Sequence, residues 1–384
     1  MTAPARPPRA RRARWGLRLV AVVSGLVLVT SGMGHAVVTG LGGELRRVEA
    51  FRALRDRPAT GRGLNLLVVG VDSREGLSAH QRRAHRLGGR ACHCADTLML
   101  AHLSADRRRL TVVSLPRDSY TRLPAHTDPA TGRRRPGGPQ KLNAALAYGG
   151  PRLVVRAVEA MTRVRVDHYL EVDFAGFVRA VDALGGVEIC TPRPLHDSRS
   201  GLHLPAGTST LDGEQALRYV RARSVDGQGD LGRMRRQQRL VAALLTRATH
   251  SGVLLNPVRL NAVVTTLLEA VRTDADFGRR EMVEWGRALH DVTETHFRSV
   301  PVADPGHTVP GLGETVLWDQ PAARRLFAAV REDRPPDEER DGRDGRPTGR
   351  PHGGAAGHRL APVSSASRAQ ASPSSTDPGA LAVC

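Results

Sequence analysis

The sequence predicts an α/β fold: a three-layer sandwich with a central mixed sheet flanked by helices, preceded by one N-terminal transmembrane helix. Apolar runs of strand length recur between residues 64 and 189. Helical patterns alternate with these runs, an order typical of a sheet covered by helices. Residues 19–41 carry no formal charge, and an apolar run of this length spans a bilayer as a helix.

The two ends of the chain lie outside the predicted domain. Residues 1–18 are a basic tail with six arginines, and Glu44 follows the apolar run, which places the N-terminus in the cytoplasm. We therefore expect an uncleaved, single-pass anchor in the cell membrane, with most of the chain outside the cytoplasm. A cleaved secretory signal ending at Ala36 is the alternative. Residues 335–384 contain no aromatic residue and are predicted to be a disordered tail.

Between the ends, a linker over residues 42–62 leads into one domain over residues 63–334. The linker is expected to hold a short charged helix, and residues 124–140 form a basic, Gly/Pro-rich loop. Strands are predicted at 64–71, 97–103, 110–115, 167–174 and 186–189, the second and third as a hairpin or as two neighbouring strands. Helices are predicted at 141–148, 151–163, 174–184, 230–250, 256–271, 276–290 and 319–331, and another begins at Asp212, where Gln215 completes a capping-box pattern.

The strong positive charge does not indicate a nucleic-acid partner. The net charge is +19, yet Lys141 is the only lysine and only 3% of the residues are aromatic, too few for base-stacking platforms. No helix-turn-helix, zinc-finger or RNP pattern occurs. We expect no nucleic acid to bind, and we expect the basic leader to meet anionic lipid headgroups.

The four cysteines are Cys92, Cys94, Cys190 and Cys384. Outside the cytoplasm a disulfide persists. We predict that Cys190 pairs with Cys92 or Cys94, and that Cys384 stays unpaired. The spacing around Cys92 and Cys94 does not match the usual zinc ladders, so no metal is expected there.

Charged residues are ordered over residues 218–238. Asp230, Arg233 and Gln237 stand at i, i+3 and i+7, which is one stripe of a helix, and Arg221 and Arg223 come just before it. Guanidinium groups that converge with a carboxylate and an amide suit a diphosphate, because the planar fork binds phosphate bidentately. The alternative is an exposed, arginine-rich helix with ordinary ion pairs.

Three more charged residues stand at strand ends. Asp72 follows the first predicted strand, Asp96 precedes the second, and Arg117 follows the third. Each one taken singly is typical of a turn or a helix cap. Together, the two carboxylates suit Mg²⁺, or Mn²⁺ in its place, since Mg²⁺ prefers oxygen ligands and bridges phosphate oxygens. With the arginines, they predict a site for a metal-bound diphosphate.

The chain also resembles a known family, the LytR-CpsA-Psr cell-wall glycopolymer transferases. The matching segments, in the order that the family has them, are NLLVVGVDSR (65–74), ADTLMLAHL (95–103), LTVVSLPRDSY (110–120), KLNAALAYGG (141–150), VDHYLEVDFAGFVRAVDALGGVEI (166–189), LDGEQALRYVRAR (211–223) and GDLGRMRRQQ (229–238). The basic tail, single anchor and outer domain are also similar to the family's architecture. The long loop at residues 75–95 and the basic loop at 124–140 depart from it, which leaves the choice of glycan and acceptor open.

The resemblance implies a membrane-anchored phosphotransferase. Such proteins move a glycan-phosphate from a polyprenyl-diphosphate-linked glycopolymer to a peptidoglycan hydroxyl. It implies that Asp72 and Asp96 help to hold magnesium and that Asp230 orients the arginines or the metal. It implies diphosphate contacts from Arg117, Arg221, Arg223, Arg233 and Gln237. The catalytic set is then Asp72, Asp96, Arg117, Arg223, Asp230 and Arg233.

Several alternatives stay open. The same site would serve a polyprenyl-diphosphate hydrolase, with water in place of the acceptor hydroxyl. A non-enzymatic, membrane-bound transcriptional regulator is a third hypothesis, although the short cytoplasmic tail has no fold for reading DNA. Candidates for the general base are Asp72, Asp96, Asp118 and Asp230. Candidates for an apolar lipid slot, or for ordinary core packing, are Val154, Val155, Val158, Val172, Phe174 and Phe177.

The anchor has a direct test. If residues 19–41 remain in the membrane, N-terminal sequencing of the membrane-bound protein will find the arginine-rich leader intact. A mature N-terminus near Val37 would show that the segment is a cleaved signal instead.

Overall fold

A computed structural model describes residues 46–73, 93–250 except 224, 226 and 228, and 265–336 except 267 and 268. The predicted anchor, most of the 75–95 loop and nearly all of the predicted tail lie outside these residues. No helix in the described ranges is long and apolar enough to cross a membrane.

A mixed sheet of seven strands forms the centre of the domain, in the order β1-β14-β9-β2-β3-β4-β15. Its strands are β1 (Arg46–Arg47), β2 (Leu64–Val71), β3 (Ala95–Leu103), β4 (Arg109–Leu115), β9 (His168–Asp173), β14 (Val271–Thr273) and β15 (Glu294–Ser299). β2 pairs with β3, and β3 with β4, in antiparallel fashion, whereas β9 runs parallel to β2 and β15 parallel to β4. The predicted mixed sheet is therefore present.

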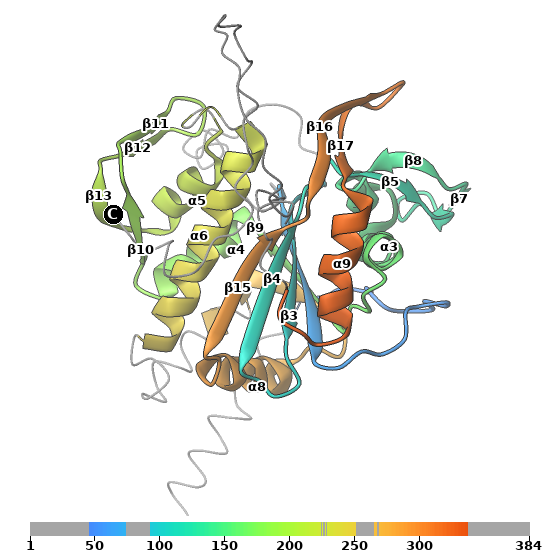
Figure 1. The fold of residues 1–384 in the computed structure, drawn as a ribbon, viewed down its shortest axis with the longest axis horizontal. Coiled ribbons are helices and arrows are strands. Elements are labelled where there is room, and N and C mark those ends of the chain that lie inside the picture. The colour runs from blue at the N-terminus through green and yellow to red at the C-terminus, as the bar shows by residue number, and fades with distance from the viewer. Residues whose placement is uncertain are drawn as a thin grey trace, which may run out of the picture.

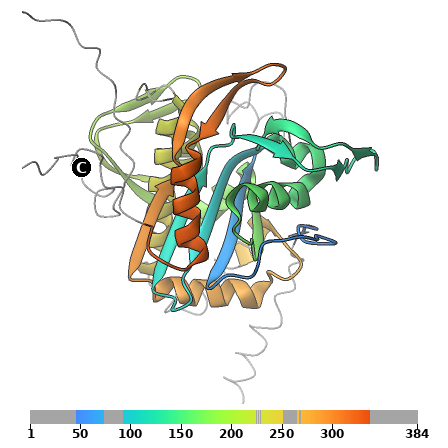
Figure 2. The ribbon, with the colours of Figure 1, turned by 45° about the vertical axis from the view of Figure 1, so that its right-hand side comes forward.

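Helices cover both faces of this sheet (Figures 1 and 2). They are α3 (Ala144–Thr162), α4 (Phe174–Ala183), α5 (Gly213–Arg221), α6 (Gly229–His250), α8 (Arg279–His290) and α9 (Gln320–Arg331). α3 and α9 pack on one face, where Val155 and Phe327 join the same buried cluster as Leu67 of β2. α6 and α8 pack on the other face, where Trp285 lies in a cluster with Met99. The layers are thus helix, sheet and helix.

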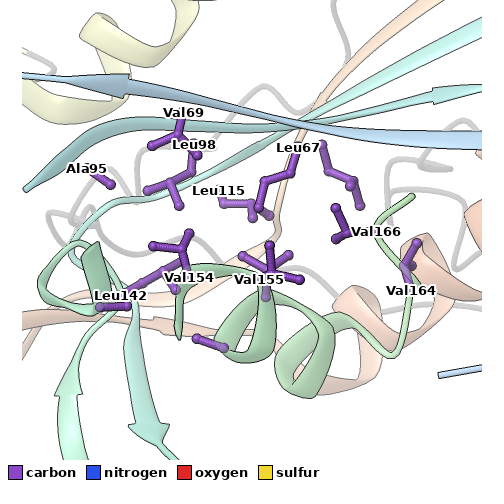
Figure 3. Packing of buried hydrophobic residues seen from close by; sticks show 14 of the residues in the cluster. Leu67, Val69, Ala95, Leu98, Leu115, Leu142, Val154, Val155, Val164 and Val166 are labelled. Carbon is purple, nitrogen blue, oxygen red and sulfur yellow. The ribbon is translucent and has the colours of Figure 1, made fainter. Parts of the chain in front are cut away.

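The larger core cluster explains why these elements form (Figure 3). Leu67, Val69, Val154 and Val155 are fully buried between β2 and α3. On β2, Leu67 and Val69 occupy alternate positions, so one face of the strand meets α3. Val158 is fully buried in the same cluster. Val154, Val155 and Val158 are therefore core residues, and their place as candidates for a lipid slot is wrong.

Five small two-stranded units surround the central sheet. They pair β5 (Tyr120–Leu123) with β8 (Gly138–Lys141), β6 (His126–Thr127) with β7 (Arg134–Arg135), β10 (Val187–Thr191) with β13 (Gly207–Leu211), β11 (Leu195–Asp197) with β12 (Leu202–Leu204), and β16 (Val302–Val309) with β17 (Gly313–Trp318). Two of them occupy the region predicted to be a loop at 124–140. That region lacks the alternating apolar pattern of a buried strand, so its short pairings were not predicted.

One prediction about helices is wrong, and a second is wrong only at its C-terminal end. The linker forms β1 followed by irregular chain, because Arg47 donates hydrogen bonds to the carbonyls of Asp274, Ala275 and Phe277 and so ties the segment to the domain. In the predicted helix at 256–271, the described residues 265, 266, 269 and 270 are helical and only the last residue, Val271, belongs to strand β14, while residues 251–264 lie outside the described part. A third prediction needs refinement, since residues 141–148 and 151–163 contribute to one helix, α3, which is kinked at Gly150.

Other predicted boundaries are close to the observed ones. β2 covers the predicted residues 64–71, and β3 and β4 form the predicted hairpin. Asp212 caps α5, where its side chain accepts from the Gln215 amide N–H and the Gln215 side chain accepts from the Asp212 N–H, both as predicted. Cys94 and Cys190 are each disulfide-bonded. Because Cys92 and Cys384 lie outside the described residues, the pairing stays a prediction, to be checked by non-reducing peptide mapping.

Core packing predicts a clear stability difference between two leucines. Leu67 is fully buried, whereas Leu312 is half-buried at the turn between β16 and β17. We expect Leu67→Ala to lower the free energy of unfolding by about 2–5 kcal/mol, because it leaves a cavity against α3. Thermal or denaturant unfolding of the purified chain measures this change. An equal loss for Leu312→Ala would contradict the assignment of the core.

Candidate active site

The charged residues predicted at strand ends gather at one edge of the central sheet. β2 and β4 end at this edge and β3 begins there, because both are antiparallel to β3. The first turns of α6 lie over the same edge, with Asp230 and Arg233 on the face toward it. Gln238 of α6 is buried and donates to the Ser114 hydroxyl, the Arg298 carbonyl and the Ser299 hydroxyl. These contacts fix α6 against β4 and β15.

Arg117 is the centre of the cluster. Its Nη1 donates to Asp96 Oδ1 at 2.5 Å, and its Nε donates to Asp118 Oδ2 at 3.2 Å. The same Nε lies 3.9 Å from Asp230 Oδ2. Burial, the largest single influence, lowers the pKa of Arg117, but the three carboxylates outweigh it and the pKa is raised. Arg117 therefore stays a cation and ties β3 to the loop after β4 and to α6.

Asp230 gathers two further arginines. Arg233 Nη2 donates to Asp230 Oδ2 at 3.1 Å, and Arg223 Nε lies 3.7 Å from Asp230 Oδ1. The backbone N–H of Arg223 donates to Asp197 Oδ2 at 3.0 Å, which holds the segment between α5 and α6 in place. Three guanidinium groups thus surround the Asp230 carboxylate, which is itself partly exposed to solvent.

Arg233 is the most deeply buried arginine of the cluster, with 6% of its surface exposed. Burial, helped by the nearby positive charges of Arg117 and Arg223, lowers its pKa to about 10, although Asp230 and Asp96 act in the opposite direction. Its Nε is buried without a hydrogen-bond partner among the described residues. A buried cation with an unpaired donor is costly to the fold, and an anionic ligand would relieve that cost. The alternative of an exposed, arginine-rich helix therefore does not describe Arg233.

A cavity of about 270 Å³ lies between these residues. Asp96, Arg117, Asp230, Arg233 and Gln237 all line it, and Gln237 Nε2 donates to the Thr97 hydroxyl at 3.0 Å. The remaining wall is partly apolar, with Leu98, Leu115, Met234, Val302, Pro305 and Val316. The stripe of α6 and the strand ends therefore face one space that combines positive charge with an apolar wall.

Three predicted site residues, Asp72, Arg221 and Arg223, do not line this cavity. Asp72 directly follows β2, and its strand neighbours pair Val71 with Ala95, so it stands at the same sheet edge as Asp96. Arg221 instead lies over the Phe174 ring, 5.3 Å from its centroid, at the start of α4. Arg223 reaches the cluster through Asp230 alone.

Asp118 was predicted only as a candidate for the general base, and its neighbours Lys141 and Asn143 carried no predicted role. Asp118 Oδ1 lies 3.5 Å from Lys141 Nζ and accepts from the Asn143 side chain at 3.4 Å. The Asn143 backbone N–H also donates to the Arg117 carbonyl, so the start of α3 is fixed to the site. The KLN triplet at residues 141–143 was a usable signal. No signal in the sequence marked Val302, Pro305 and Val316 as site residues, because strands β16 and β17 were not predicted.

The oxygen donors at this edge fit Mg²⁺. Asp72 and Asp96 are carboxylates on adjacent strands, and Mg²⁺ is commonly held by one or two carboxylates together with substrate phosphates. No group of three or more His, Cys, Asp or Glu side chains among the described residues is arranged to hold a metal on its own. The donor set thus suits a metal that arrives with a phosphate ligand.

Chemically, the arrangement suits an anion with several oxygens. Arg233 offers buried N–H donors, Arg117 offers half-buried ones, Arg223 offers exposed ones, and Gln237 adds an amide. Such fixed donors stabilise negative charge that develops during transfer of a phosphoryl group. Single ion pairs on a solvated helix face would not require the burial seen at Arg233.

Comparisons with known proteins show which family the sequence matches. The model of the LytR_cpsA_psr family matches residues 45–330. The probable cell wall biosynthesis protein LcpB of Corynebacterium glutamicum is 34% identical over 312 residues, which cover 80% of this chain and 70% of that protein. The polyisoprenyl-teichoic acid–peptidoglycan teichoic acid transferase TagU of Oceanobacillus iheyensis is 26% identical, over 79% of this chain and 88% of that protein.

The fold is also similar to solved structures. The LytR-Csp2A-Psr enzyme from Actinomyces oris superposes with a TM-score of 0.54 at 23% identity, covering 74% of this chain and 95% of that one. At this identity the likeness concerns the fold alone. Because the family model covers well over half of the sequence, the chain belongs to the LytR-CpsA-Psr family.

Proposed function

We propose that this protein is a membrane-anchored cell-wall glycopolymer transferase that moves a glycan-phosphate from a polyprenyl-diphosphate carrier to a peptidoglycan hydroxyl. The observation that carries the proposal is the cavity that Arg117, Arg233 and Gln237 line together with Asp96 and Asp230. The names of its relatives support the substrate class, since TagU of O. iheyensis is named as a teichoic acid transferase acting on peptidoglycan.

The reaction is written as one displacement at phosphorus. The acceptor hydroxyl oxygen bonds to the phosphorus that carries the glycan, and the bond from this phosphorus to the bridging oxygen of the diphosphate breaks. The hydroxyl proton passes to a carboxylate, and the polyprenyl monophosphate leaves. Such a transfer depends mainly on positioning and on stabilising charge at the phosphoryl oxygens.

The arginines are proposed to provide that stabilisation. Arg233 donates from a buried position, where a charged hydrogen bond is stronger than in water, and Arg117 is held in place by three carboxylates. Arg223, in the segment before α6, and Gln237, on α6, are proposed to complete the contacts to the diphosphate. The apolar wall of Leu98, Leu115, Met234 and Val316 is proposed to meet the first carbons of the lipid.

The geometry ranks the candidates for the general base. Both oxygens of Asp118 meet cationic or amide donors, and both oxygens of Asp230 lie close to arginines. Among the described residues, Asp96 meets Arg117 through Oδ1 alone. We therefore propose that the proton passes to the Asp72 and Asp96 pair at the sheet edge rather than to Asp118 or Asp230.

Mg²⁺ is proposed as the cofactor, held by Asp72 and Asp96 with the substrate diphosphate. When bound, it would neutralise charge on the phosphoryl oxygens. The residues of this chain keep their roles beside it: the arginines orient the diphosphate, and Asp230 orients the arginines. Removing divalent metal with a chelator is expected to abolish transfer, and adding Mg²⁺ or Mn²⁺ is expected to restore it.

The proposed location of the protein at the cell membrane follows from the same substrate. A polyprenyl carrier stays in the membrane, so residues 19–41 as an anchor would keep the domain beside it. The names of the relatives do not favour the hydrolase or the transcriptional regulator.

The reaction product provides the deciding test of the transferase. The full chain is incubated with Mg²⁺, a polyprenyl-diphosphate-linked sugar and soluble peptidoglycan fragments. We expect polyprenyl monophosphate together with sugar-phosphate bound to the fragments, as measured by mass spectrometry. Sugar-phosphate free in solution, with unmodified fragments, would show that the protein is a hydrolase.

Replacing the buried cation is predicted to separate activity from stability. Arg233→Met should lower the transfer rate by about 10²–10³, since a donor to the transferring phosphoryl group is lost. It should leave the melting temperature unchanged or raised, because the variant no longer buries a charge with an unpaired donor. Arg223→Ala should also slow transfer without loss of the fold.

The matched control is Arg324→Ala, which removes an exposed arginine from α9 and should leave transfer unchanged. Arg247 does not serve as a neutral control, because its Nε donates to the Leu184 carbonyl at the end of α4. Normal transfer by Arg233→Met would refute the catalytic role of the cluster.

A further inference from the structure

A second cavity lies away from the candidate active site and shares no lining residue with it. It has a volume of about 330 Å³. Its walls come from residues 53–56 after β1, from the β6–β7 hairpin, and from residues 149–156 of α3. These segments lie side by side in Figures 1 and 2 on the outer side of α3.

The cavity is strongly basic. Arg55, Arg134, Arg152 and Arg156 line it, against the single carboxylate of Asp56. In the part of the chain that the structure describes, Arg55, Arg134 and Arg152 form no ion pair, and Arg156 donates only to the Ala125 carbonyl, at 2.9 Å.

The neighbouring Arg135 shows the contrast, because it pairs with Asp128 at 3.0 Å. Among the described residues, no carboxylate forms an ion pair with the arginines of the cavity, so they keep their positive charge there. Concave surfaces of one charge concentrate ligands of the opposite charge.

The backbone of α3 adds to this charge. Gly150 has φ 64° and ψ −166°, which interrupts the helix, and Pro151 starts its second half. Gly149, Arg152 and Leu153 line the cavity, so the first turn of the second half faces it. The start of a helix carries N–H groups without helical partners and a partial positive charge, and both favour an anion.

Two rings at the rim point to a sugar rather than to a bare anion. Tyr148 is 42% exposed, and its ring lies parallel to that of His126, with centroids 6.3 Å apart. His126 Nδ1 lies 3.0 Å from the Pro124 carbonyl oxygen, which can only accept, so Nδ1 is the donor of this pair.

The other ring nitrogen of His126, Nε2, is buried without a hydrogen-bond partner among the described residues. A sugar hydroxyl both donates and accepts hydrogen bonds, so it can serve as the partner of this nitrogen. The face of a tyrosine ring offers an apolar surface beside a polar hydroxyl, which suits the mixed surface of a sugar ring.

The cavity stands on the same helix as the active site. α3 begins one residue after Asn143, whose side chain contacts Asp118. Arg152 lies nine residues after Asn143, beyond the kink at Gly150, so the two residues are no more than about 32 Å apart even for extended chain. One saccharide chain can therefore span both places.

We propose that this cavity binds a negatively charged segment of a saccharide chain, several sugar units away from the group that reacts. The inference deepens the proposed transferase function and rests on it. The shared chemistry is a sugar that carries carboxylate or phosphodiester groups, and it has two sources: the acceptor glycan or the donor glycopolymer.

The test measures binding without turnover, by calorimetric titration of the full chain in detergent micelles. The probes are soluble peptidoglycan fragments with peptide carboxylates, phosphodiester-linked hexose oligomers, uncharged chitin oligomers and anionic phospholipid vesicles. The variants are the double substitution Arg134→Gln with Arg152→Gln, and Tyr148→Ala. The matched control is Arg324→Gln with Arg325→Gln, which removes two exposed charges from α9.

We expect one charged glycan to bind more tightly than chitin. The double variant should weaken this binding about tenfold or more, Tyr148→Ala should weaken it as well, and the control should bind like the parent. Whichever charged probe responds identifies the source. Unchanged affinity of the variants, chitin binding as tight as that of the charged glycans, or an effect confined to vesicles would overturn the inference.

The active-site variant keeps the two proposals separate. Arg233→Met should lose transfer and still bind the charged glycan at the second cavity. If the parent binds the glycan through Arg152 but transfers nothing, the proposed reaction fails while the binding site stands. If the parent transfers normally and the double variant binds like the parent, only the inference fails.

Discussion

Arg117 meets carboxylates from three separate segments: Asp96 of β3, Asp118 of the loop after β4, and Asp230 of α6. These segments are brought to one edge by the antiparallel pairing of β2, β3 and β4, and α6 is held over that edge by Gln238. The ion pairs then fix the direction of the guanidinium groups before any ligand arrives. Fixed donors stabilise developing charge without having to reorganise. The positions of Arg223 and Arg233 depend on this network through Asp230.

The stability that the apolar layers give to the fold offsets the cost of burying the Arg233 charge at the site. Leu67 and Val155 join β2 to α3 on one face, and Met99 and Trp285 join the sheet to α8 on the other. Against this background Arg233 remains buried, with its pKa lowered to about 10 and its Nε unpaired among the described residues. Natural proteins keep such costly groups where function needs them. The burial is thus better explained by an anionic ligand than by a contribution to the fold.

Much of the fold was predictable because its signals are local. The run at 64–71 is β2, and the Asp212 capping box starts α5. β1, β14 and β15 were not predicted, since each is a short or polar segment whose partner lies far away in the sequence. Spacing put Asp230, Arg233 and Gln237 on one face of a helix, and these residues do line one cavity. Spacing could not show that Arg233 is buried or that Arg221 turns toward Phe174, because tertiary packing decides both.

The central claim is that the buried Arg233 charge exists to meet a diphosphate. The most direct measurement is the melting temperature of the full chain as Mg²⁺ and inorganic pyrophosphate are added, for the parent and for Arg233→Met. A ligand that binds only the folded state raises the melting temperature. The account predicts that pyrophosphate raises it for the parent and leaves that of the variant nearly unchanged. An equal rise in both proteins, or no rise in the parent, would contradict it.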